Sequence, residues 1–138
     1  MMKAKNRFSM TWVAMALMIF LGLGLGSCKR EDPEPVAGKG GNAVLNIVPR
    51  HHAKIIDSCL VFIKYNAQDL PSSFDDSVWC QPVNGVSTAI FSGLTKGQYY
   101  IFGRGYDEDI DQICIGGGPF TITEEGNLHY NLAITEEH

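Results

Sequence analysis

Three histidines could supply a metal site if the fold brings them together. His51 and His52 are adjacent, and His129 lies near the other end of the chain. Imidazole nitrogens are common ligands of zinc and copper. Neighbours on a strand point to opposite faces, so His51 and His52 are poorly placed to chelate one ion as a pair. Either of them could bind Zn²⁺ or Cu²⁺ with His129 or an acid, because first and last strands often pair in β-sandwiches. The alternative is a polar loop with one packed histidine.

The acidic run of residues 107–111 is a second candidate metal site. Asp107, Asp109 and Asp111 alternate in the same way as the first ligands of a Ca²⁺-binding loop. The sixth position holds Gln112 where an EF-hand loop requires glycine, and the expected glutamate at the twelfth is also missing. This run therefore predicts either a loose Ca²⁺ site or a solvated acidic loop.

Three cysteines, Cys59, Cys80 and Cys114, lie in the part of the chain that is expected to fold. In an oxidising compartment, three cysteines are compatible with one disulfide and one remaining thiol. We expect the pair Cys59–Cys80, because antiparallel strands on either side of the polar stretch 66–77 would place these residues opposite each other. Cys114 would then be a buried thiol.

Five aromatic residues could form a surface on which a sugar or a peptide stacks, although core packing explains most of them as well. They are Tyr65, Trp79, Tyr100, Phe102 and Tyr106. The chain contains no nucleophile elbow, zinc-protease motif or paired-carboxylate signature. Gly116-Gly117-Gly118 precedes a proline and a strand rather than a helix, so it predicts a turn or bulge and not a phosphate loop. The sequence therefore predicts no enzymatic activity and no cofactor.

Residues 42–138 have the pattern of short β-strands separated by turn residues. The expected strands are 43–48, 57–65, 78–83, 86–91, 98–106, 112–115, 120–123 and 128–135. Asn84-Gly85 is typical of a hairpin turn, because a type I′ turn needs two positive φ angles. Pro49 is expected to end the first strand. No helical periodicity persists, so the pattern predicts an all-β, antiparallel sandwich.

Residues 1–27 have the organisation of a secretory signal peptide, with three basic residues followed by an apolar run. Leu25-Gly26-Ser27-Cys28 resembles the bacterial lipobox, in which a peptidase cuts before a lipidated cysteine. The resemblance implies that Cys28 is the first residue of the mature protein and carries three acyl chains. Two or more chains give a stable anchor, so Cys28 predicts attachment to a membrane. An uncleaved membrane helix is the alternative.

Residues 28–41 predict a flexible tether, because they combine charge, proline and glycine with almost nothing apolar. Lys29 directly after the cysteine favours the outer membrane over inner-membrane retention. The acidic residues that follow resemble the export signals of surface-exposed lipoproteins, so the protein is expected to be either periplasmic or surface-exposed. Cleavage before Cys28 leaves 8 of the 11 basic residues against 15 acidic ones, a net charge of about −7. This charge argues against a nucleic-acid partner.

Residues 89–100 resemble the F-x-G-L-x-x-G-x-Y run of prealbumin-like domains, which include the carboxypeptidase regulatory-like and Cna-B-type domains of bacterial surface proteins. Residues 56–61 resemble the preceding strand of these domains, with Ser58 and Cys59 where glycine and alanine are usual. The resemblance implies a Greek-key β-sandwich of seven to eight strands. It implies nothing catalytic, because such domains serve as spacers, stalks or recognition modules.

The sequence as a whole predicts a non-enzymatic, lipid-anchored protein of the cell envelope. Its β-sandwich is expected to be a binding or structural module, with a protein or a glycan as the class of ligand. The alternative function is binding of Ca²⁺, Zn²⁺ or Cu²⁺.

Overall fold

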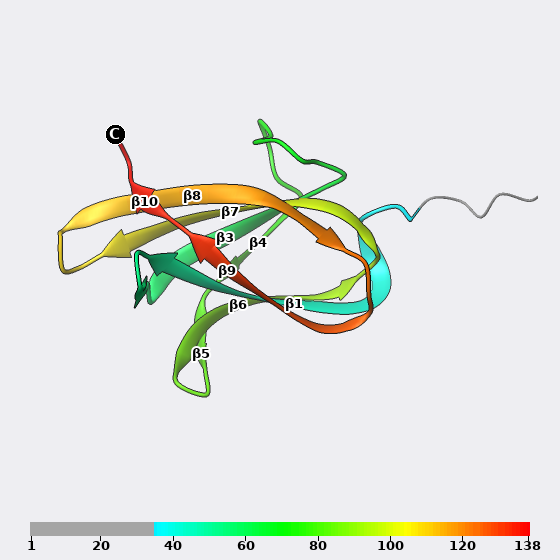
Figure 1. The fold of residues 1–138 in the computed structure, drawn as a ribbon, viewed down its shortest axis with the longest axis horizontal. Coiled ribbons are helices and arrows are strands. Elements are labelled where there is room, and N and C mark those ends of the chain that lie inside the picture. Colours follow the sequence, from blue (N-terminus) through cyan, green and yellow to red (C-terminus); the bar gives the residue numbers. More distant parts are fainter. Residues whose placement is uncertain (1–34) are drawn as a thin grey trace, which may run out of the picture. The chain divides into compact units, whose positions relative to one another are not determined.

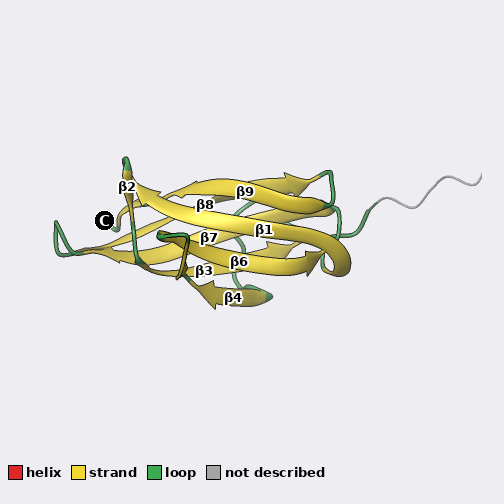
Figure 2. Ribbon diagram, turned by 90° about the horizontal axis from the view of Figure 1, so that it is seen from below, coloured by secondary structure: helices red, strands yellow, loops and turns green. Residues whose placement is uncertain are grey.

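The structure is a computed structural model that describes residues 35–138, and these residues form two β-sheets (Figures 1 and 2). The predicted signal peptide and Cys28 lie outside the described residues. No helix occurs within residues 35–138, so this part of the chain has no helix that could span a membrane. The prediction of an all-β sandwich is confirmed.

Ten strands make up the described part of the chain. They are β1 (Lys39–His51), β2 (Lys54–Ile55), β3 (Ser58–Tyr65), β4 (Asp76–Trp79), β5 (Gln81–Val83), β6 (Val86–Leu94), β7 (Gly97–Asp107), β8 (Gln112–Ile122), β9 (Gly126–Ala133) and β10 (Thr135–Glu136). Sheet I has the order β2-β1-β6-β5, with β9 also paired to β1, and sheet II has the order β10-β8-β7-β3-β4. The strand count exceeds the predicted seven to eight because β2, β5 and β10 are short additional strands of two or three residues.

The pairing between β1 and β9 is parallel, whereas the other strand pairs are antiparallel. This pair joins the first strand to the strand that was expected to be the last. The chain also changes sheets at Cys80, because β4 pairs with β3 in sheet II and β5 pairs with β6 in sheet I.

Two predicted strand ends are wrong. Pro49 does not end β1, which continues to His51. The Pro49 carbonyl accepts a hydrogen bond from Ile56 N (3.1 Å). The N–H that proline lacks would point to that same side, so the ladder between β1 and β9 loses no hydrogen bond. Likewise, β8 runs through residues 116–119 without a break and pairs with β7 along its whole length.

The glycines of β8 make room for neighbouring chain segments. A Cβ on Gly116 would collide with the carbonyl oxygen of Ala133. A Cβ on Gly117 would lie 2.7 Å from the Ile101 oxygen and 2.9 Å from the Tyr100 ring. Close packing, and not a turn, therefore explains why glycines stand at these positions.

β1 begins at Lys39, inside the segment that was predicted to be a tether. The glycines of this segment have specific structural roles. Gly40 has φ +104°, and a Cβ on Gly41 would collide with the Leu94 carbonyl. The register between β1 and β6 also shifts here, between Lys39 and Ala43. Glycine thus allows the irregular start of β1, at residues whose composition alone suggested a flexible tether.

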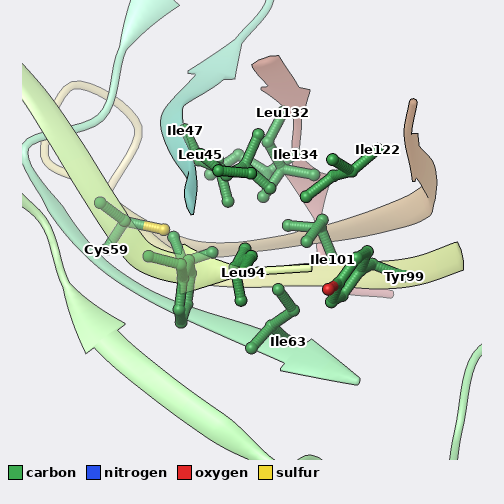
Figure 3. Close-up of a cluster of buried hydrophobic side chains, with 14 of the residues drawn as sticks. Leu45, Ile47, Cys59, Ile63, Leu94, Tyr99, Ile101, Ile122, Leu132 and Ile134 are labelled. Carbon is green, nitrogen blue, oxygen red and sulfur yellow. The ribbon is translucent and has the colours of Figure 1, made fainter. Parts of the chain in front are cut away.

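The core lies between the two sheets and is built from alternating residues of the strands (Figure 3). On β3, the face of Cys59, Val61 and Ile63 is buried, and Tyr65 packs against the core from its margin. Figure 3 shows the buried side chains converging between the strands, with the Cys59 sulfur among them. The largest fully buried residues are Tyr99, Phe91, Leu45, Ile47, Ile56, Ile63, Leu94, Ile101, Ile122, Leu132, Ile134 and Val61.

The sandwich has two different ends. At one end, which we call proximal because the described chain enters the sandwich there, the Ala37 N–H donates to Asn66 Oδ1 (3.2 Å). At the distal end, β1 finishes at His51, β7 finishes at Asp107 and β10 contributes Glu136. Figures 1 and 2 both show the arrowhead of β1 and the C-terminus at the same end. His51, Asp107 and Glu136 therefore lie together at the distal end.

Candidate functional site

A buried histidine–carboxylate pair forms the centre of the distal end. His51 is 5% exposed, and its Nδ1 lies 2.8 Å from Asp107 Oδ2. Asp107 is 3% exposed, and its other oxygen accepts hydrogen bonds from Lys54 Nζ (2.9 Å) and Asp109 N (3.0 Å). The hairpin of β1 and β2 brings Lys54 here, because Lys54 is paired with His51 in the register. One carboxylate thus accepts hydrogen bonds from the Lys54 ammonium group, the His51 ring and a loop N–H.

The charges of this pair follow from its partners. The hydrogen bond from Lys54, and then that from His51, lower the pKa of Asp107 to about 2. The hydrogen bond to Asp107 raises the pKa of His51, although burial opposes this rise. An ionised carboxylate only accepts hydrogen bonds, so His51 donates from Nδ1. In the neutral imidazole, Nε2 then carries the free lone pair.

The Nε2 atom of His51 is buried and has no hydrogen-bond partner among the described residues. Its nearest anionic neighbour is Oε2 of Glu136, which lies 3.3 Å away without meeting hydrogen-bond geometry. Glu136 belongs to β10 and stands opposite Cys114 of β8. The pKa of the Glu136 carboxyl is lowered by its own backbone N–H and by His51. In the neutral ring, an unpaired nitrogen and a carboxylate therefore lie next to each other.

His52 completes a group of three possible ligands. It is the first residue of the turn between β1 and β2 and has φ +55°. The turn places its ring beside that of His51, with centroids 4.4 Å apart. The expectation that the two histidines point apart assumed a continuing strand, and it is wrong because the strand ends between them. One ligand atom each from His51, His52 and Glu136 lies within 4.8 Å of the others.

The other predicted ligands lie elsewhere or are already engaged. His129 is exposed on β9 opposite Asn46, five residues before His51 on β1, which corresponds to about 16 Å along the strand. Lys54 Nζ lies between Asp107 and Asp109, 2.6 Å from Asp109 Oδ2. Asp111 accepts a hydrogen bond from the Tyr106 hydroxyl.

Within residues 35–138, the three aspartates of the acidic run do not form a common ligand group, whereas His51, His52 and Glu136 do. No local sequence pattern indicates Glu136 as a ligand, because its position depends on the pairing of β10 with β8.

Cys59 and Cys80 stand opposite each other. The register Leu60–Trp79 continues to this pair, and Cys80 N donates to the Cys59 carbonyl (3.0 Å). Both side chains are thiols in the structure. A hydrogen bond between the two thiols raises the pKa of Cys59, which burial raises further, and lowers that of Cys80. Cys114 is also a buried thiol. The disulfide remains a prediction.

The five aromatic residues proposed as a stacking surface are spread over different places. Tyr65 packs edge-on against Tyr99 (5.8 Å between centroids). Phe102 stacks on Phe74 of the loop between β3 and β4 (5.7 Å). Trp79 is 57% exposed at the edge strand β4. Tyr106 and Trp79 line one shallow hollow on sheet II, together with Ser58, Arg104, Gly105 and Ile113.

Comparison with known proteins gives no match: no family model, no curated protein and no solved structure is similar to this chain. The chemistry of the residues themselves is therefore the basis for assigning a function.

Proposed function

We propose that the mature protein is a non-enzymatic, lipid-anchored protein of the outer membrane whose β-sandwich is a binding module. The anchor is the Cys28 thioether with its acyl chains, and the residues that follow Cys28 are the tether. The signal-peptide pattern of residues 1–27 and the sequence Leu25-Gly26-Ser27-Cys28 support this proposal. Three acyl chains bind a membrane stably, where one alone binds marginally.

The observation that carries the binding role is the direction of β1. This strand has thirteen residues, which span about 40 Å at about 3.3 Å per residue. The tether joins the sandwich at the Lys39 end, and the His51 cluster lies at the other end. An anchor that precedes Lys39 leaves the distal end free to meet a ligand. The same arrangement serves on the periplasmic side and on the cell surface.

The prealbumin-like resemblance fits the positions of its key residues. Phe91 and Leu94 are buried, and Gly93 between them has φ +70°, which glycine adopts without strain. Tyr99 is fully buried and its hydroxyl donates to the Thr95 carbonyl (2.7 Å). The motif residues thus define a turn and its core contacts. This supports our proposal that the domain is a Greek-key sandwich of the carboxypeptidase regulatory-like kind, used for recognition or as a spacer.

Growth with labelled palmitate tests the anchor. We expect label on the wild-type protein and on Cys114→Ala, and none on Cys28→Ala. The Cys114→Ala variant is the matched control, because it also removes one cysteine but leaves the lipobox intact. Density-gradient separation of the membranes should place the wild-type protein in the outer-membrane fraction. Label that persists on Cys28→Ala would refute the proposed anchor.

A further inference from the structure

We propose that His51, His52 and Glu136 form a binding site for a divalent transition-metal ion, and that Zn²⁺ is the ion that fits best. The inference rests on the proposed binding role of the sandwich, for which it names a ligand at the distal end. It does not depend on the lipid anchor.

The spacing of the three ligands suits a tetrahedral ion. Zinc binds imidazole nitrogen at about 2.0–2.1 Å and carboxylate oxygen at about 2.0–2.2 Å, so two ligands of a tetrahedron lie about 3.3–3.5 Å apart. His51 Nε2 and Glu136 Oε2 are already 3.3 Å apart. The His52 ligand atom lies within 4.8 Å of both. His52 is exposed on a turn, so its side chain has room to rotate, and binding of the ion requires such a rotation to close the remaining gap.

The buried Nε2 atom of His51 independently points to a ligand. The His51 side chain is only 5% exposed, and this atom has no hydrogen-bond partner among the described residues. A buried polar atom without a partner costs free energy, so such atoms are uncommon in folded proteins. Here the ring nitrogen lies 3.3 Å from a carboxylate oxygen, an arrangement that becomes favourable when a cation binds both atoms. A metal ion would satisfy both groups at once.

The partner of the other ring nitrogen fits the same assignment. Metal-binding histidines usually donate their second N–H to a carboxylate, which fixes the ring and the tautomer. Asp107 takes this role, with Oδ2 2.8 Å from His51 Nδ1. Lys54 binds the opposite oxygen of Asp107 at 2.9 Å. Asp107 is therefore a positioning residue behind His51, and its charge is compensated without the metal.

The types of ligand determine the class of ion. Two imidazoles and one carboxylate favour zinc and its transition-metal neighbours, whereas Ca²⁺ takes six to eight oxygen ligands. The acids that could supply such oxygens are engaged, since Lys54 binds Asp107 and Asp109 and Tyr106 binds Asp111. Three protein ligands also leave the fourth position of a tetrahedral zinc ion open, so a bound ion could hold an anionic or thiolate group of a partner.

Zinc titration of the purified lipoprotein tests this assignment. The mature protein, in non-ionic detergent and freed of metal with a chelator, is titrated with Zn²⁺ against a chromogenic competitor. We expect one Zn²⁺ per chain. We expect at least tenfold weaker binding in His52→Asn and in Glu136→Gln. Asparagine tolerates the positive φ of residue 52, so this variant keeps the turn.

Two variants outside the group are the matched controls. His129→Ala removes a histidine from the same sheet, and Glu137→Gln removes the neighbouring acid, and both should bind Zn²⁺ as the wild type does. Co²⁺ in place of Zn²⁺ should give the visible absorption of a four-coordinate ion in the wild type and lose it in Glu136→Gln. Thermal unfolding with and without Zn²⁺ provides the fold check for each variant, because a bound ligand raises the unfolding temperature.

Three results would overturn the assignment. The first is a titration in which the wild type binds no Zn²⁺. The second is an unchanged Zn²⁺ affinity in both His52→Asn and Glu136→Gln. The third is an affinity for Ca²⁺ as high as that for Zn²⁺. Palmitate labelling of the same preparation separates this inference from the proposed function. A labelled protein that binds no metal refutes the metal site alone, and an unlabelled protein that binds Zn²⁺ refutes the anchor alone.

Discussion

Oxidation of Cys59 and Cys80 to a disulfide is expected to raise the free energy of unfolding by about 3 kcal/mol. The bond would close a loop from residue 59 to residue 80, which is 22 residues counting both ends. The loop-entropy relation gives about 11 cal/mol/K for 22 residues, or about 3.4 kcal/mol at 25 °C. The two residues already face each other across β3 and the end of β4, so little rearrangement opposes this gain.

The position of the bond also matters. Cys80 lies between β4 of sheet II and β5 of sheet I, at the point where the chain changes sheets. Cys59 is fully buried on β3. A disulfide would therefore fix the segment that connects β4 to β5 to strand β3 of sheet II. Two thiols form this bond by losing two protons and two electrons to a disulfide-bearing oxidoreductase of the envelope, whose own disulfide is reduced. Cys80 is the expected attacking thiolate, because its pKa is lowered and it is half-buried.

Urea unfolding with and without a reductant measures the effect. The wild type should lose about 3 kcal/mol when reduced, with a fall in the thermal midpoint of about 12–15 °C. Cys114→Ala should show the same loss, and Cys80→Ala should show no dependence on reductant. A change below about 1 kcal/mol in the wild type would refute the reasoning. So would loss of the reductant effect in Cys114→Ala, since Cys114 would then belong to the bond.

Counting thiols in denaturant gives a second, independent readout. A lipidated Cys28 has no thiol, so the lipoprotein with the disulfide should contain one thiol, that of Cys114. Three thiols would mean a lipidated protein without the disulfide. An even count would mean that Cys28 is not lipidated. The thiol count thus tests the anchor and the disulfide in one experiment.

Two further outcomes follow from the packing and the charges. Gly116→Ala should lower the free energy of unfolding in urea by at least about 2 kcal/mol, because the new Cβ would collide with the backbone of Ala133. Gly118→Ala should cost clearly less, because its Cβ would lie 3.1 Å from a side-chain hydroxyl. Equal losses in the two variants would contradict this. The ionised Asp107 should stabilise the fold fully above about pH 4 and lose this effect as the pH falls through its folded pKa of about 2, because its pKa in the folded state is the lower one. Thermal midpoints measured from pH 2 to pH 5 should show this fall in the wild type and a weaker one in Asp107→Asn, and parallel curves would count against it.

Local periodicity accounts for the part of the fold that the sequence predicted correctly. The pattern of short apolar segments between turn residues identified strands such as β3, because the preference of β-branched and aromatic residues for strands lies in the local sequence itself. The same local reasoning failed at residues 116–119. There, glycine and proline suggested a turn, but the close approach of β7 and Ala133 requires small residues in a continuous strand.

The candidate site was predictable only in part for the same reason. His51 and His52 were identified from residue type. Their arrangement depends on a turn at His52 that has no glycine or asparagine to indicate it. Glu136 joins them only because β10 pairs with β8, a contact between distant parts of the chain. His129 was expected from the pairing of the first and last strands, which does occur, but the register places it opposite Asn46.

The parallel pairing of β1 with β9 has a mechanical consequence. β1 is the first strand of the described chain, and it is hydrogen-bonded to β6 on one side and to β9 on the other. A pull on its N-terminal end, opposed by a load at the distal end, acts along the strand axis. The hydrogen bonds of both ladders then share the force and must break together in shear, instead of breaking one after another. The two ladders therefore resist a pull on the N-terminal end of β1 when the opposing load acts on the neighbouring strands.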